Sequence, residues 1–247
     1  MIEIRNLHFS YRNFHALKGV SLRAEPGVYG LLGPNGAGKS TLMKSVVGML
    51  PLQKGEILIN GKSLTRMDRS EKRLLGYLPQ HFDVMDFVTV ERNLIYAAWA
   101  HGIDRNEAGK AISEILEITH LGGKANVLAR SLSGGMRQRL GIACALVHRP
   151  RVALLDEPTV GLDPLQRAGI RNLLLELSRE SVILISTHLV EDLAAVASRV
   201  LVMNSGLIAF DGTVDDLNAL GERNPSPGLN ILECGYQAAL ARIPNRQ

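Results

Sequence analysis

The sequence contains few cysteines and no long hydrophobic run. Its 2 cysteines, Cys144 and Cys234, lie far apart and form no CxxC pair, so nothing indicates a disulfide framework or a zinc site. The longest apolar stretches, such as LIYAAWA, are far shorter than the roughly 20 residues that cross a bilayer. The opening residues, MIEIRNLHFSY, lack the basic and apolar segments of a secretory signal. We therefore expect a protein of the reducing cytoplasm that reaches a membrane only through a partner.

The sequence also lacks any concentration of charge of one sign. The formal net charge of the 247 residues is +4, and the basic residues are scattered rather than grouped in blocks. This pattern is typical of an ordinary solvated surface and does not predict nucleic-acid binding. Hydrophobic residues make up 46% and charged residues 21%, which is typical of a globular protein and excludes disordered and fibrous classes.

Short apolar runs that end in polar residues predict a parallel sheet. Residues 28–32 form such a run before a glycine loop, and the apolar residues after the loop have helical spacing. The runs in RVALLDEP and SVILISTH are uninterrupted, as expected for strands buried on both faces. Polar residues at the carboxyl ends of such strands line the usual ligand crevice of an α/β sheet.

The remaining segments predict additions to this α/β core. The first strands alternate and suggest an antiparallel sheet, residues 82–149 look mainly helical, and residues 204–206 suggest a hairpin turn. We expect one domain over residues 1–218. Its core with the β subdomain comprises residues 1–81 and 150–218, residues 82–149 form a helical subdomain, and residues 219–247 form a short tail.

The glycine loop matches the pattern G-x-x-x-x-G-K-[ST] in full. Glycines let backbone N–H groups turn toward phosphate oxygens, and the following helix points its positive end at the same anion. We expect Lys39 to reach the β and γ phosphates, Ser40 to bind Mg²⁺, and Thr41 to help hold the α phosphate. A chance glycine-rich turn is the alternative, which the strand-loop-helix setting disfavours. The predicted nucleotide-binding residues of this loop are Gly33, Pro34, Asn35, Gly36, Ala37, Gly38, Lys39, Ser40 and Thr41.

Two strand ends carry candidate catalytic residues. Asp156 and Glu157 follow the apolar residues 152–155, where an aspartate can orient the water shell of a metal and the next carboxylate can polarise the attacking water. Glu157 is the candidate base. His188 follows the last apolar strand and could contact the γ phosphate. Taken alone, an acidic pair or a single histidine is a weak signal, but the glycine loop strengthens both.

A second glycine motif, SLSGGMRQRL, needs a separate explanation. Ser133, Gly134 and Gly135 precede an expected helix and would form another anion-binding helix start. The first loop already covers the phosphates of its own nucleotide, so two such sites imply two chains. The alternative is a simple serine N-cap followed by a flexible glycine pair.

These motifs together resemble the ATP-binding subunit of ABC transporters. The resemblance covers residues 1–218 and implies a P-loop NTPase fold: a mixed, mainly parallel sheet with flanking helices, an antiparallel β subdomain and an inserted helical subdomain. It rests on the order and spacing of Tyr11, GPNGAGKST, Gln80 in GYLPQ, LSGGM, ALLDEP, GLDP and His188.

The resemblance also implies roles for residues and partners. Tyr11 resembles the aromatic that stacks on adenine, Gln80 the residue that links Mg²⁺ and the attacking water to the helical subdomain, and Asp163 the acid that couples two sites across a dimer. The residues similar to the family's signature, Ser133 to Gly135, would contact the γ phosphate bound by the opposite subunit. The implied partners are a second ATPase subunit, as a homodimer, and a multi-span membrane permease that docks after Gln80, around Phe82, Val84, Met85 and Phe87.

The expected function is ATP hydrolysis that powers transport across a membrane. The LSGGM variant and the tail resemble the ATPases of ABC-2-type exporters, which favours export and a position on the cytoplasmic face of the membrane. The alternative is a non-transport ABC ATPase that acts in cell-division signalling or cofactor assembly, with a soluble partner in place of the permease. An importer role also stays open.

Overall fold

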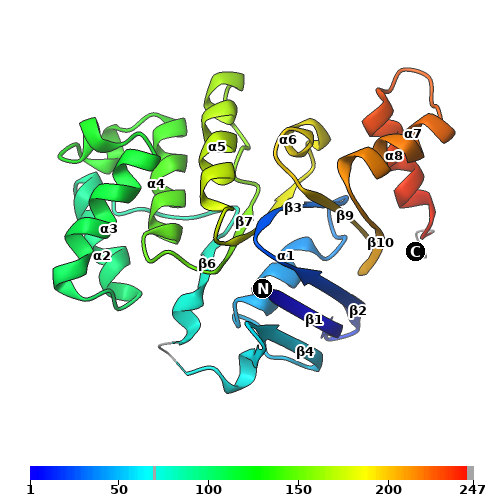
Figure 1. Cartoon of the computed structure of the whole chain (residues 1–247), viewed down its shortest axis with the longest axis horizontal. Coiled ribbons are helices and arrows are strands. Elements are labelled where there is room, and N and C mark those ends of the chain that lie inside the picture. Colours follow the sequence, from blue (N-terminus) through cyan, green and yellow to red (C-terminus); the bar gives the residue numbers. More distant parts are fainter. Residues whose placement is uncertain (69–70, 244–247) are drawn as a thin grey trace.

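The computed structural model describes residues 1–68 and 71–243, and a six-stranded sheet lies at its centre (Figure 1). The strand order is β10-β9-β3-β8-β7-β6, and all neighbours are parallel except β10 and β9. The uninterrupted apolar runs are therefore strands buried on both faces, as predicted. The strands are β3 (Gly27–Leu32), β6 (Leu75–Leu78), β7 (Val152–Asp156), β8 (Val182–Thr187), β9 (Arg199–Asn204) and β10 (Leu207–Gly212).

The amino-terminal part of the chain forms a second, four-stranded sheet. Its order is β2-β1-β4-β5 and all its pairs are antiparallel, which confirms the expected β subdomain. The alternating burial of β2 fits a sheet with one face on the core and the other in water. The strands are β1 (Ile2–Tyr11), β2 (Phe14–Ala24), β4 (Lys54–Ile59) and β5 (Lys62–Ser63).

One helix, α1 (Lys39–Val46), lies between the two sheets and shares their core. Its residues Leu42, Met43 and Val46 have no exposed surface. A second core lies on the other face of the six-stranded sheet. Strand β7 supplies both, because Leu154 faces the core around α1 and Leu155 faces the core around the remaining helices. Burial on both sides fixes the height and direction of each strand end, and hence of the polar residues that follow.

Residues 82–149 are mainly helical, as predicted. In Figure 1 they form the green part at one end of the molecule, where α4 packs beside β6. An ion pair between Asp86 and Arg137 ties the segment after β6 to α4, and the Arg130 guanidinium lies over the Phe87 ring. The helices are α2 (Val90–Ala100), α3 (Arg105–Ile118) and α4 (Gly134–Leu146).

The carboxyl-terminal part begins with a β-hairpin at the predicted position. Ser205 and Gly206 connect β9 to β10 with positive φ angles at both positions, as a type I′ turn requires. Two helices follow, and the expected boundary between residues 218 and 219 falls inside the first of them. The remaining helices are α5 (Pro164–Leu177), α6 (Val190–Ala194), α7 (Val214–Arg223) and α8 (Ile231–Ala241), and the short 3₁₀ turns are η1 (Leu64–Arg66), η2 (Glu71–Leu74), η3 (Gly122–Lys124) and η4 (Ala129–Ser131).

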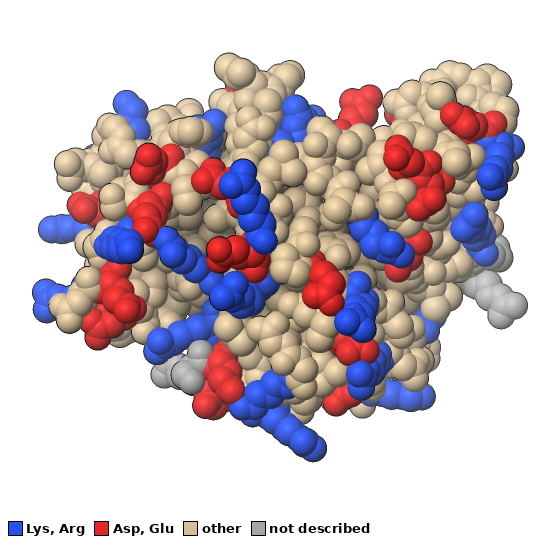
Figure 2. Space-filling model, in the orientation of Figure 1, with Lys and Arg blue, Asp and Glu red and all other residues tan. Residues whose placement is uncertain are grey.

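The surface carries mixed charge. On the face shown in Figure 2, Lys and Arg side chains alternate with Asp and Glu side chains and do not merge into one basic area. Within residues 1–68 and 71–243, no helix combines the length and the apolar character needed to span a bilayer.

Candidate nucleotide-binding site

The glycine loop connects the end of β3 to the start of α1. Gly38 is the N-cap residue of α1, with φ of 105°, in the left-handed region. A Cβ atom at this position would lie 2.6 Å from the carbonyl oxygen of Ala16, so the backbone approach requires glycine. The amino end of α1 therefore opens onto the loop, where its unpaired N–H groups and helix dipole favour an anion.

Lys39 is held inside this loop. Its Nζ donates hydrogen bonds to the carbonyl oxygens of Gly33 at 2.6 Å and Pro34 at 3.2 Å. Burial lowers the pKa of the Lys39 ammonium, and the negative charges of Glu157 and Asp156 oppose that shift. A buried ammonium with carbonyls as its hydrogen-bond partners, beside the backbone N–H groups of the glycine loop, suits a phosphate group that takes up the same positive charge.

A cavity of about 230 Å³ lies over the loop and brings most of the predicted residues together. Gln80, Asp156 and Glu157 line it opposite the loop, so residues from three distant parts of the sequence meet at one edge of the sheet. The full lining is Phe14, Ala16, Pro34, Asn35, Gly36, Ala37, Gly38, Lys39, Ser40, Thr41, Gln80, Asp156 and Glu157.

The aromatic residue in the lining is Phe14 rather than Tyr11. The two are paired across the tip of the β1–β2 hairpin, but the Tyr11 ring packs edge-on against Phe9, with ring centroids 4.8 Å apart. Phe14 is 60% exposed and was not among the residues predicted from the sequence. An aromatic residue within a strand is an ordinary core signal, and only the fold shows that this one borders the cavity.

Asp156 is fixed by the neighbouring strand. It lies opposite Ser186 in the parallel register of β7 and β8, is buried, and accepts a hydrogen bond from the Ser186 hydroxyl. Ser186 was also absent from the sequence prediction, because a serine inside a buried strand carries no distinctive pattern. The pairing holds one carboxylate oxygen and leaves the other for a second partner.

Glu157 has an unusual backbone conformation. Its φ is 53°, in the left-handed region, and its N–H lies 3.1 Å from the carbonyl oxygen and 3.2 Å from the hydroxyl oxygen of Ser186. Strained conformations of this kind in non-glycine residues concentrate at functional sites. The Glu157 side chain is 9% exposed, and His188 Nδ1 lies 3.1 and 3.2 Å from its two oxygens. The predicted base and the predicted histidine are therefore direct neighbours.

The residues of the second glycine motif lie outside this cavity. Ser133 is the N-cap of α4, and its hydroxyl accepts a hydrogen bond from the Met136 N–H at 3.3 Å. Ser133 and Gly134 are exposed, while Gly135 packs against Gln166 in the first turn of α5. Asp163 is the N-cap of α5 and accepts from the Gln166 N–H at 2.8 Å. This second helix start is therefore open to solvent. It does not line the cavity over the glycine loop of its own chain.

The fold and the site define a P-loop nucleotide hydrolase. A phosphate-binding loop leads from a parallel strand into a helix, and two carboxylates at the end of another strand face it across a cavity. The family model described as ABC transporter matches residues 17–160, and the chain belongs to this family. It is an ATP-binding subunit of an ABC transporter and an ATPase.

Relatives with different named roles match most of the chain. A methionine import ATP-binding protein of Carboxydothermus hydrogenoformans is 35% identical over 227 residues, which cover 88% of this chain and 67% of the relative. A linearmycin resistance ATP-binding protein of Bacillus subtilis is 32% identical over 219 residues, covering 88% and 70%. An ATP-binding cassette solved as a dimer in a post-hydrolysis state with ADP and Pi superimposes with a TM-score of 0.76 at 25% identity, over 86% of this chain and 98% of that one.

Proposed function

We propose that this ATPase works as a homodimer on the cytoplasmic face of a membrane and powers export through a separate multi-span permease. In this arrangement residues 1–81 and 150–218 act as the nucleotide-binding core. Residues 82–149 act as a helical subdomain whose position depends on the bound nucleotide. The observation that carries the permease assignment is an apolar groove between these two parts of the chain, beside the end of α2.

The dimer assignment rests on the open position of the second glycine motif. Ser133 and Gly134 form an exposed helix start away from the loop of their own chain, so a second copy can bring them to its nucleotide. One solved relative, an ATP-binding cassette, is a dimer in its structure. Because the chain has intact candidates for every catalytic position, two identical subunits would contain two competent sites.

We infer the catalytic roles from the contacts in the cavity. Glu157 is the base that accepts a proton from the attacking water, and His188 holds the Glu157 carboxylate in place through Nδ1. Lys39 stabilises negative charge on the transferred phosphoryl group, and Gln80 positions the water. The adenine base lies at the tip of the β1–β2 hairpin, next to Phe14 and Tyr11.

The residues at the cavity also fit Mg²⁺. Ser40, Gln80 and Asp156 present hydroxyl, amide and carboxylate oxygens, which are the ligand types that this cation prefers. When bound, Mg²⁺ neutralises charge on the phosphate oxygens. The hydrogen bond from Ser186 orients Asp156 toward such a role.

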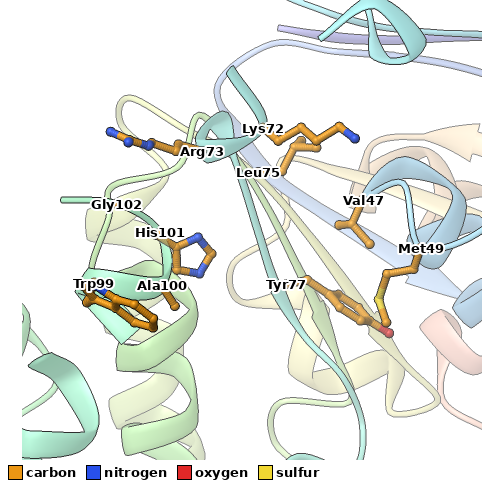
Figure 3. A pocket seen from close by; sticks show the side chains of 10 residues that line it. All are labelled: Val47, Met49, Lys72, Arg73, Leu75, Tyr77, Trp99, Ala100, His101 and Gly102. Atoms are coloured by element: carbon orange, nitrogen blue, oxygen red, sulfur yellow. The ribbon is translucent and has the colours of Figure 1, made fainter. Parts of the chain in front are cut away.

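The proposed permease contact is a groove of about 700 Å³ beside α2 (Figure 3). Trp99 and His101 line one side, Tyr77 and Met49 the other, and Lys72 and Arg73 form its upper rim in this view. Trp99 is 70% exposed, and Tyr96 and Ile95 continue the apolar surface along α2. Large exposed apolar side chains that lie together on one helix are typical of an interaction site. A short amphipathic helix with an acidic residue would suit its apolar floor and basic rim.

This groove differs in part from the surface expected from the sequence. Phe82 and Val84 are partly buried against the helical core, and a Cβ at Gly141 would meet the Phe82 ring at 2.3 Å. Met85 and Phe87 are exposed, as expected. None of these four residues lines the groove, whose apolar lining comes from the end of α2, from residues after α1 and from β6.

Export is the direction supported by the resistance relative, while the methionine relative is an importer. The apolar groove suits a membrane subunit in either case. A tagged Glu157→Gln variant, incubated with Mg-ATP, should trap an ATP-bound dimer and retain its partners. We expect its purification from detergent-solubilised membranes to recover a multi-span permease, and expect that a Trp99→Glu change will abolish this recovery.

Two outcomes would contradict parts of the proposal. Recovery of only soluble partners, with the protein absent from membranes, would overturn the transport function while leaving the ATPase. Hydrolysis of ATP by Glu157→Gln at the parent rate would overturn the assignment of the base. A Leu175→Glu variant serves as a matched control, because Leu175 is also an exposed apolar residue and lies near the end of α5, away from Asp163 and from the groove lining.

A further inference from the structure

The turn between β9 and β10 packs against the phosphate-binding loop and is hydrogen-bonded to it. The N–H of Gly206 donates to the carbonyl oxygen of Ala37 at 3.0 Å, and the Gly206 carbonyl accepts from the Lys18 N–H at 2.8 Å. The contact is close, since a Cβ at Gly33 would lie 2.5 Å from the carbonyl oxygen of Met203. Any displacement of this turn therefore moves the loop that binds the phosphates.

Asn204 occupies the start of this turn and is 4% exposed. Its Nδ2 donates to the carbonyl oxygens of Leu240 at 3.1 Å and Ile243 at 2.7 Å, at the carboxyl end of α8. Its Oδ1 accepts from the Ser205 hydroxyl at 3.1 Å. Two carbonyl acceptors on one side fix the orientation of the amide. The Leu240 carbonyl, which also accepts from the Ile243 N–H at 3.3 Å, and the Ile243 carbonyl just beyond α8 thus receive a donor from the hairpin.

Further contacts attach the same helix to the same hairpin. The Arg242 guanidinium lies 5.9 Å from the centre of the Phe210 ring on β10. At its other end, the N-cap residue of α8 is Asn230, whose side chain donates to Glu191 on α6 at 3.5 Å. Helix α6 starts two residues after His188, so α8 connects the hairpin to the segment that follows His188.

We propose that Asn204 is a positioning residue for ATP binding: its buried amide fastens the end of α8 to the turn that supports the phosphate-binding loop. The carboxyl-terminal helices are then part of the ATP site in energetic terms, although they do not border it. Because coupling between two sites is reciprocal, ATP bound at the loop must also stabilise the attachment of α8.

The test compares Asn204→Asp with Asn224→Asp. A carboxylate at position 204 cannot donate and would face two carbonyl oxygens. Asn224 is a matched control, because its Nδ2 also donates to a helix carbonyl, that of Leu220 at 2.9 Å, but it is exposed and lies away from the turn. For Asn204→Asp we expect the Kd of a fluorescent ATP analogue and the KM for ATP to rise about tenfold, with kcat within about twofold. Asn224→Asp should leave all three unchanged.

Hydrogen exchange of the unaltered protein supplies a second readout, which does not depend on whether the variant folds. In the unaltered protein, saturating ATP analogue should slow amide exchange at residues 236–243 as well as at the loop. In Asn204→Asp, exchange at residues 33–41 should become faster without nucleotide. Any of three results would overturn the proposal. The first two are unchanged nucleotide affinity in a folded Asn204→Asp protein and a loss confined to kcat. The third is amide exchange at residues 236–243 of the unaltered protein that is the same with and without nucleotide.

Discussion

His188 Nδ1 lies 3.1 Å from one carboxylate oxygen of Glu157 and 3.2 Å from the other. Glu157 is nearly buried and strained at φ of 53°, whereas His188 is 58% exposed. The histidine therefore holds a carboxylate whose backbone is already fixed by Ser186. This relationship supports the proposed role of His188 in orienting the base and leaves its second ring nitrogen for the phosphate or the attacking water.

Replacement of His188 by alanine should slow hydrolysis without weakening ATP binding. We expect kcat to fall by roughly 10²- to 10³-fold, because the proton acceptor loses its fixed orientation, while the KM for ATP changes little. Steady-state ATPase assays measure both constants. His81→Ala is the control, since His81 is an exposed histidine near Gln80 and should retain full activity. An effect of His188→Ala on KM alone would contradict the role.

Phe14 and Tyr11 should contribute unequally to nucleotide affinity. Stacking of a base on an aromatic ring is worth about 1 to 3 kcal/mol. Because Phe14 borders the cavity and Tyr11 packs on Phe9, we expect Phe14→Ala to raise the KM for ATP about tenfold and Tyr11→Ala to raise it less. Phe14→Tyr should behave like the parent. The reverse order of effects would restore Tyr11 as the main partner of adenine.

The two glycines at positions 36 and 38 should differ in their cost to stability. Both have positive φ, so alanine at either costs about 1 kcal/mol of unfolding free energy. A Cβ at Gly38 also meets the Ala16 carbonyl at 2.6 Å, whereas a Cβ at Gly36 meets nothing within 4 Å. Urea unfolding without nucleotide should therefore show a loss at least about 1 kcal/mol larger for Gly38→Ala. Equal losses would show that the loop adapts freely.

The stability of the protein should fall in mild acid because of a partly buried pair of stacked histidines. The rings of His101 and His148 stack with centroids 3.6 Å apart, and His148 Nε2 lies 3.0 Å from the Leu75 carbonyl oxygen. Burial, with a smaller contribution from His101, lowers the pKa of His148 from 6.5 to about 4. Burial and the charge of Arg73 also lower the pKa of His101.

The unfolded chain takes up a proton at His148 below pH 6.5, whereas the folded protein does so only near pH 4. The contribution of neutral His148 to the stability of the folded protein is therefore complete above pH 6.5 and is lost as the pH falls toward 4. Between pH 7.5 and pH 5, His148 alone should account for a loss of about 2 kcal/mol of unfolding free energy. Urea unfolding of His148→Gln should show a weaker pH dependence by this amount, and His81→Gln should not. An unchanged slope in His148→Gln would rule out His148 as the cause.

Local patterns were sufficient for much of the site. The loop from Gly33 to Thr41, the strand end at Asp156 and the hairpin at residues 204–206 each depend on residues close in sequence, so their chemistry is visible in the pattern. The contacts that give Phe14, Ser186 and Asn204 their roles were not predicted, because each depends on a partner from another element. The groove beside α2 was predicted only in part from the sequence. Phe82 was expected at the docking surface but packs on the helical core, and hydrophobicity alone does not distinguish the two positions.

The sequence by itself determined the family, the phosphate-binding loop and the α/β class, because glycine conformations, strand burial and helix starts are local properties of the chain. Only the tertiary structure decided which side chains share the cavity, that His188 contacts Glu157, and that the end of α8 is bonded to the turn beneath the loop. Those relationships depend on packing between elements distant in sequence, where a shift of about 1 Å makes or breaks a hydrogen bond.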